Sequence, residues 1–207
     1  GTLKTGDLIR MNVEKDKRNA IAIHHSSTHL MHAALKQVLG DHVQQKGSLV
    51  DENKLRFDFS HSKPLLKEEI SAIEDLVNRE SLNNEEVTTQ NMQLEVAMKS
   101  GAEALFGEKY EDEVRVLSMG SESFSVELCG GTHVSRTGDI GTFLITNQSS
   151  VASGVRRIEA VAGKVALKHL KEIQRINEEL QQKLNIPADG IVDKVESLIQ
   201  ENKKLKK

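Results

Sequence analysis

The sequence predicts an α+β fold, a mixed or antiparallel sheet with helices packed around a metal site, followed by a C-terminal helical hairpin or coiled coil. Short strands alternate with single helices, without the regular repeat of βαβ units. Two pairs of potential metal ligands lie about a hundred residues apart, so one shared site would fold distant segments together. Beyond about residue 163, glycine becomes rare while Lys, Glu, Gln and Leu dominate. We therefore expect a domain over residues 1–163 and a helical segment over 164–207.

Composition narrows the range of functions. The 207 residues are 29% charged and 37% hydrophobic, and the net charge of −3 is too balanced for a generally basic nucleic-acid binder, although a local basic patch is compatible with it. Aromatic residues make up 3%, which argues against binding single strands mainly by base stacking. A single cysteine excludes an intrachain disulfide. Without a long apolar run or a leader, we expect a cytoplasmic protein that does not contact membranes.

The first helix is predicted from residue 25 to about residue 39. Its apolar residues recur at helical spacing, Ser26, Ser27 or Thr28 could cap its start, and Gly40 lies where a C-terminal cap glycine belongs. Residues 55–59 alternate between apolar and polar and predict a strand. A second helix is expected over 64–83, with Pro64 in its first turn. Four more short strands are predicted around residues 114–116, 124–128, 143–145 and 155–158.

The tail carries a different pattern. From Ala166 to Leu184, the residues of one seam are spaced 4, 3, 4, 3 and 4, and the pattern resumes from Ile191 to Leu205 after a break at 186–190. This heptad-like spacing indicates two amphipathic helices. They could fold back on each other or pair with another chain so that 164–207 self-associates. Alternatively, the segment is one amphipathic helix packed on the domain.

Two pairs of side chains suit metal binding. His25 and His29 are four positions apart, which places both imidazoles on one helix face. Cys129 and His133 are separated by three residues, two of them glycines, which allow the tight backbone curl that convergence requires. Three imidazoles and a thiolate match the preference of zinc for tetrahedral nitrogen and sulfur ligands. The competing interpretation is buried histidines and an inert thiol, and the spacing does not distinguish a structural zinc from a catalytic one.

Seven segments together resemble the editing domain of alanyl-tRNA synthetase in its bacterial form. They are HHSSTHLM at 24–31, QKGS at 45–48, LRFDFSH at 55–61, ALFGEKY at 104–110, ELCGGTH at 127–133, SRTGDIG at 135–141 and GVRRIEA at 154–160. The resemblance covers about residues 1–163, and the tail is similar to the helical segment that follows the editing domain. It implies one zinc ion bound by His25, His29, Cys129 and His133.

The resemblance also implies a reaction, the hydrolysis of tRNA(Ala) mischarged with serine or glycine. It implies that Thr28 contacts the serine hydroxyl and that Gln45 lies near the substrate. From the residues alone, Thr28 would be a helix cap and Gln45 a surface loop residue. The amides of Gly130 and Gly131 are candidates for stabilising the oxyanion of ester hydrolysis.

Arg136, Arg156 and Arg157 are the basic residues nearest the glycine-rich segment, and they are candidates for contacting phosphates of the tRNA acceptor end. Nothing in the sequence resembles an ATP-binding aminoacylation domain, so ATP would be used only by the rest of a parent alanine–tRNA ligase. Two alternatives remain. One is a zinc-stabilised tRNA-binding or oligomerisation module without turnover. The other is a free-standing or threonyl-type editing deacylase.

Overall fold

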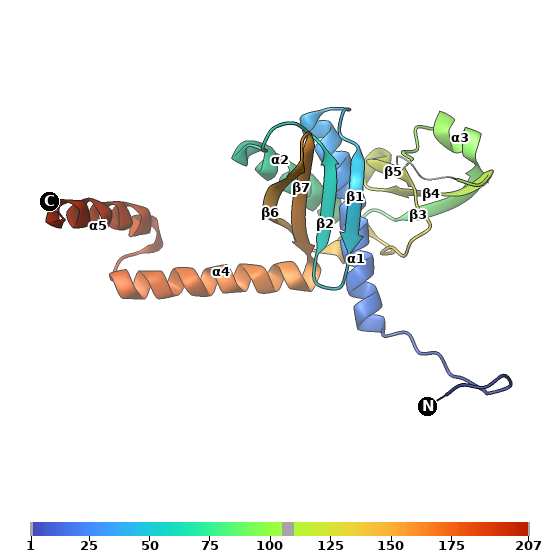
Figure 1. Cartoon of the computed structure of the whole chain (residues 1–207), viewed down its shortest axis with the longest axis horizontal. Coiled ribbons are helices and arrows are strands. Elements are labelled where there is room, and N and C mark those ends of the chain that lie inside the picture. The colour runs from blue at the N-terminus through green and yellow to red at the C-terminus, as the bar shows by residue number, and fades with distance from the viewer. Residues whose placement is uncertain (1, 105–109, 207) are drawn as a thin grey trace. The chain divides into compact units, whose positions relative to one another are not determined.

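The computed structural model describes residues 2–104 and 110–206 and confirms the α+β class (Figure 1). Contacts divide the chain into two compact units, Gly1–Val165 and Ala166–Lys207. The helices are α1 (Lys15–Leu39), α2 (Lys67–Leu82), α3 (Leu94–Lys99), α4 (Gly163–Leu184) and α5 (Ile191–Leu205). The strands are β1 (Gln45–Val50), β2 (Leu55–Ser60), β3 (Thr88–Gln93), β4 (Glu113–Met119), β5 (Ser125–Leu128), β6 (Phe143–Ala152) and β7 (Val155–Ala162).

The first unit contains two antiparallel sheets. Four strands follow the order β1-β2-β7-β6, and three follow the order β3-β4-β5. In the larger sheet, two hairpins from distant parts of the chain join where β2 pairs with β7, in register from Leu55 opposite Ala160 to Ser60 opposite Val155. The fold of this unit therefore depends on pairing between segments far apart in the sequence.

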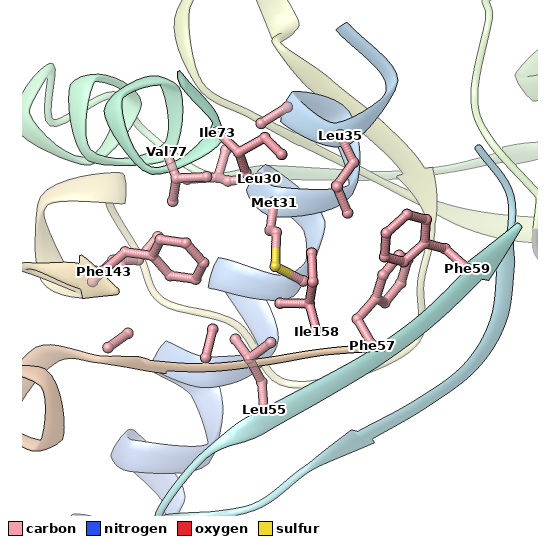
Figure 2. Packing of buried hydrophobic residues seen from close by; sticks show 14 of the residues in the cluster. Leu30, Met31, Leu35, Leu55, Phe57, Phe59, Ile73, Val77, Phe143 and Ile158 are labelled. Carbon is pink, nitrogen blue, oxygen red and sulfur yellow. The ribbon is translucent and has the colours of Figure 1, made fainter. Parts of the chain in front are cut away.

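One apolar core lies between this larger sheet and helices α1 and α2 (Figure 2). Phe57 of β2, Ile158 of β7 and Leu30 of α1 are fully buried in it. Phe57 and Ile158 are opposite each other in the β2–β7 register, so their side chains leave the same face of the sheet. A smaller cluster packs α3 against the β3-β4-β5 sheet. The segment ALFGEKY lies mostly outside the described residues, which omit 105–109.

Helix α1 begins ten residues before its predicted start. It starts at Lys15, so the prediction that Ser26, Ser27 or Thr28 caps the helix is wrong. Residues 15–19 are exposed and carry no apolar stripe, which is why the hydrophobic periodicity did not reveal them. Gly40 does end the helix, with a φ of 110° and its amide donating to the Lys36 carbonyl.

Three elements were not predicted. Strand β1 was missed because its sequence contains a glycine and has no clear alternation of apolar and polar residues. Gln45 is the first residue of this strand, so the interpretation of Gln45 as a loop residue is wrong. Strand β3 is almost wholly polar and exposed, and α3 has only six residues. The second helix begins at Lys67, three residues after Pro64.

The second unit contains most of α4 and all of α5. Apolar side chains of both helices remain partly exposed, at 38% for Leu170, 50% for Ile173 and 41% for Leu198. The hairpin or coiled coil therefore stays a prediction. In the described part of the chain, no helix has both the length and the apolar character needed to cross a membrane.

Candidate metal centre

The two predicted ligand pairs come together in the first unit. Ligand atoms of His25, His29, Cys129 and His133 all lie within 4.8 Å of one another. His24 and His32 flank the first pair in the sequence but do not belong to this group. The structure therefore brings together the four residues that the sequence singled out and leaves out the two neighbouring histidines.

Helix α1 supplies the first pair from its buried middle turns. Polar residues are tolerated there because their hydroxyl groups are hydrogen-bonded. Ser27 Oγ donates to the Ile23 carbonyl at 2.7 Å, and Thr28 Oγ1 donates to the His24 carbonyl at 2.8 Å. Such bonds to the carbonyl four residues earlier satisfy a buried hydroxyl without breaking the helix.

The second pair follows strand β5. The Cys129 amide donates to the Arg115 carbonyl at 3.0 Å, which extends the β4–β5 pairing by one residue. The Arg115 guanidinium in turn donates to the carbonyls of Cys129, at 3.3 Å, and Gly131, at 2.7 Å. These contacts hold the glycine turn against the end of β4.

A side chain at position 131 would collide with His25. A Cβ atom there would lie 2.2 Å from Cε1 and 2.7 Å from Nδ1 of His25, whereas a Cβ at Gly130 would meet nothing within 4 Å. The backbone of Gly131 therefore closes against an imidazole of the cluster, and only a residue without a side chain allows this approach.

Two distances in the cluster are close to those expected around a tetrahedral zinc ion. Cys129 Sγ lies 3.6 Å from His25 Nε2 and 3.3 Å from His133 Nε2. Zinc bonds of about 2.0 Å to nitrogen and 2.3 Å to sulfur imply sulfur–nitrogen separations of about 3.5 Å. In addition, Nε2 of His29 is buried and makes no hydrogen bond to any residue that the structure describes. A bound cation would give this nitrogen a partner.

The electrostatics favour the ligand form of the cysteine. Burial raises the pKa of Cys129, but hydrogen bonds from His133 and His25 outweigh it and lower the pKa to about 3. Burial lowers the pKa of His29, whereas the charges of Glu127 and Cys129 raise it to about 10, so a metal ion would bind His29 in exchange for a proton. These contacts favour the thiolate, the form of cysteine that binds metals.

Sequence reasoning missed the residues that surround these ligands. Ser26 Oγ accepts the Val134 amide at 3.2 Å and lies 3.3 Å from His133 Nδ1. Glu127 is 4% exposed and contacts His29 Nδ1 at 2.6 Å. A signal for Glu127 was present, because it lies two positions before Cys129 on a strand and so shares its face.

The other predicted site residues are buried, lie in a strand, or are bonded to other side chains. Thr28 is 4% exposed. Gln45 is half-buried at the start of β1, opposite Phe59. Arg157 forms a two-point ion pair with the buried Asp58, at 2.6 and 2.7 Å, and the same carboxylate raises the pKa of Arg157.

The two remaining arginines also have partners. Arg156 donates to Gln148 Oε1 at 3.2 Å. The exposed Arg136 donates to Asn84 Oδ1 at 3.1 Å. The amides of Gly130 and Gly131 donate no hydrogen bond to any described residue.

Comparison with known proteins places this arrangement in a family. Residues 114–159 match the family model described as "Threonyl and Alanyl tRNA synthetase second additional domain". The whole chain is 52% identical to an alanine–tRNA ligase of Parvibaculum lavamentivorans, 51% to one of Pseudomonas entomophila and 53% to one of Saccharophagus degradans. It covers 24% of each of these relatives, so the chain spans about a quarter of their length. The chain is therefore a segment of the alanine–tRNA ligase family, in which residues 114–159 match the second additional domain.

Proposed function

We propose that this chain is the editing region of an alanine–tRNA ligase and hydrolyses the ester of Ser-tRNA(Ala) and Gly-tRNA(Ala). The observation that carries the proposal is the cluster of three imidazoles and a thiolate, built from two segments about a hundred residues apart inside a chain of this family. Relatives at 51–53% identity are alanine–tRNA ligases, which supports an alanyl-type rather than a threonyl-type deacylase.

His25, His29, Cys129 and His133 would hold one zinc ion. When bound, zinc would supply a Lewis acid that polarises the ester carbonyl or orients a substrate group. The amides of Gly130 and Gly131 are the proposed donors to the oxyanion, and the absence of intrachain acceptors among the described residues leaves them available. Gln45 is proposed to orient the attacking water.

Thr28 is proposed to select the serine ester. Its hydroxyl proton is donated to the His24 carbonyl, so only an oxygen lone pair remains for a ligand. A serine hydroxyl would therefore have to donate to Thr28 Oγ1. An alanyl ester lacks this donor, so it forms no hydrogen bond with Thr28 and is not stabilised by it. Glycine also lacks a hydroxyl, so its hydrolysis must depend on excluding the methyl group of alanine.

The proposed partner is the acceptor end of tRNA(Ala). Arg136 is the best placed of the three candidate arginines, because it is exposed and its contacts are to neutral groups of Asn84. Arg157 neutralises Asp58, so its replacement would mainly cost stability. We expect Arg136→Gln to weaken tRNA binding and to reduce the salt dependence of binding by about one unit of slope. Equal slopes for both proteins would remove Arg136 from the interface.

Charging of tRNA with alanine and ATP is proposed only for the rest of the parent enzyme. The exposed apolar seams of α4 and α5 support a second proposal, that residues 164–207 self-associate. A sedimentation experiment over a range of protein concentrations tests it, and a monomer throughout would contradict it.

The deciding experiment measures ester release from Ser-tRNA(Ala), Gly-tRNA(Ala) and Ala-tRNA(Ala), with and without a zinc chelator. Selective release of serine and glycine that stops on chelation and returns with zinc is the expected result. Tight zinc binding and tRNA binding without release would favour a module without turnover. Thr28→Val, compared with Thr28→Ser, should lose serine release while its zinc content stays unchanged.

A further inference from the structure

A buried carboxylate joins one ligand of the metal centre to a histidine outside it. Glu127 Oε2 accepts a hydrogen bond from His29 Nδ1 at 2.6 Å, and Oε1 accepts one from His32 Nδ1 at 3.1 Å. His29 and His32 are three positions apart on α1, so both face β5. Glu127 is 4% exposed and His32 is 5% exposed.

The contacts of this carboxylate determine which nitrogen of each imidazole carries a proton. An ionised carboxylate only accepts hydrogen bonds, so His29 and His32 both carry hydrogen at Nδ1. In the neutral form of His29, Nε2 is then an unprotonated acceptor. His29 belongs to the ligand cluster, its Nδ1 is bonded to Glu127, and its Nε2 is buried without a hydrogen-bond partner among the described residues.

We propose that Glu127 and His32 are a positioning pair for the metal ligand His29. Glu127 fixes the protonated nitrogen and the ring orientation of His29, so that Nε2 faces the cluster. His32 holds the second oxygen of Glu127 and thereby keeps the first oxygen on His29. The inference rests on the proposed zinc site, but it concerns ligand geometry and does not require hydrolysis.

Glu80 provides a matched control for a carboxylate that is merely buried. It is 2% exposed, and its Oε2 accepts the Ser121 amide at 2.8 Å. It contacts no residue of the metal cluster in the described part of the chain. If Glu127 influenced zinc affinity only because it is buried, replacing either glutamate would change the zinc affinity equally.

The first experiment compares Glu127→Gln with Glu80→Gln in the full chain. In glutamine an NH₂ group replaces one of the two carboxylate oxygens, so one of the two imidazole N–H groups faces a donor instead of an acceptor. We expect Glu127→Gln to weaken zinc binding roughly 10- to 100-fold, measured by competition with a chromophoric chelator. Glu80→Gln should leave the zinc affinity within about twofold of the original protein, even if thermal stability falls.

The second experiment restores the lost contact. In the double variant Glu127→Gln with His32→Phe, the competing donor is gone, so the amide oxygen can turn to His29. The amide NH₂ can then donate to Ser125 Oγ, which lies 3.4 Å from Glu127 Oε1. The new phenyl ring can pack on Phe57, as the His32 ring does at 5.2 Å between centroids. We expect the double variant to recover most of the zinc affinity lost by Glu127→Gln.

Two spectroscopic readouts separate positioning from folding. Side-chain nitrogen NMR should show hydrogen at His29 Nδ1 in the zinc-bound original protein and a broadened or altered signal in Glu127→Gln. The visible spectrum of the cobalt-substituted protein should change in Glu127→Gln and not in Glu80→Gln. Unchanged zinc affinity, NMR and cobalt spectra in Glu127→Gln would overturn the proposal. Tight zinc binding without ester hydrolysis would contradict the proposed function while leaving this inference intact.

Discussion

Helices α1 and α4 are both long and amphipathic, but their surroundings differ. In α1, Leu30, Met31, Ala34 and Leu35 are all 0% exposed, and the helix contacts β-strands from both ends of the first unit. In α4, Leu167, Leu170 and Ile173 are 38–50% exposed. Apolar periodicity therefore predicts a helix but does not reveal what covers its apolar face. In α1 the apolar face is covered by segments that are distant in the sequence. The metal cluster adds a further contact of this kind, between α1 and residues 129–133.

Removal of the metal should have the largest effect, and it should affect α1 but not α4. Zinc bound only by the folded state at a free concentration of about 1,000 Kd contributes about 4 kcal/mol to the free energy of unfolding. A chelator should therefore lower the stability of the first unit and increase hydrogen exchange around residues 25–32. Exchange along α4 should not change. Equal loss of protection in both helices would show that the metal does not act specifically on α1.

A matched pair of leucine substitutions tests the difference in packing. Leu30→Ala should lower the free energy of unfolding by about 2–5 kcal/mol, because the core of the first unit cannot fill the cavity. Leu170→Ala, at a residue already 38% exposed, should cost less than about 1 kcal/mol. Chemical denaturation monitored by circular dichroism measures both. A large cost for Leu170→Ala that grows with protein concentration would instead reveal a partner for α4.

The glycine turn provides a finer test of how the cluster is held. Gly131→Ala would place a Cβ 2.2 Å from His25 Cε1, so the imidazole or the loop must move. We expect zinc affinity to fall roughly 10-fold or more. Gly130→Ala is the control, because its Cβ meets nothing within 4 Å, and its zinc affinity should be unchanged. Similar losses for both variants would mean that flexibility of the turn matters rather than the close approach.

The smallest expected effect concerns Glu74 on α2. Burial raises the pKa of its carboxyl group, while Oε1 accepts the Ile145 amide at 2.6 Å. A raised pKa means that stability is greatest below the unfolded-state value and falls as the pH rises through the folded-state value. Glu74→Gln keeps an acceptor for the amide without the charge, so it should raise the melting temperature by roughly 1–2 °C at pH 7. The gain should vanish near pH 4, and a gain that persists there would exclude the carboxyl group as its cause.

The sequence predicted which four side chains cluster better than it predicted the elements around them. His25 and His29 follow from helical spacing, and Cys129 and His133 from a short glycine turn, so both pairs are local patterns. Their convergence was inferred from the chemistry of zinc and agrees with the geometry of the cluster. The resemblance was confirmed at the level of the family, because the whole chain matches about a quarter of the length of alanine–tRNA ligases.

What the sequence did not reveal depends on contacts between distant residues. Strand β3 is polar and is recognisable only through its pairing with β4. The buried Asp58 pairs with the partly exposed Arg157 of the neighbouring strand, and no local pattern indicates that this pair exists. Glu127 was the nearest to being predictable, because a carboxylate two residues before a ligand cysteine shares its side of the strand.

The order of strands in the larger sheet has a consequence for the timing of synthesis. Asp58 of β2 and Arg157 of β7 pair across 99 positions of sequence, although each belongs to a hairpin that can form locally. At about 5–20 residues per second, the ribosome needs roughly 5–20 s to deliver the second hairpin after the first. Throughout that interval one edge of β2 has no partner, and the apolar face of α1 lacks its contacts with β5 and β7. The nascent chain is therefore expected to bind chaperones most strongly between the emergence of β2 and that of β7.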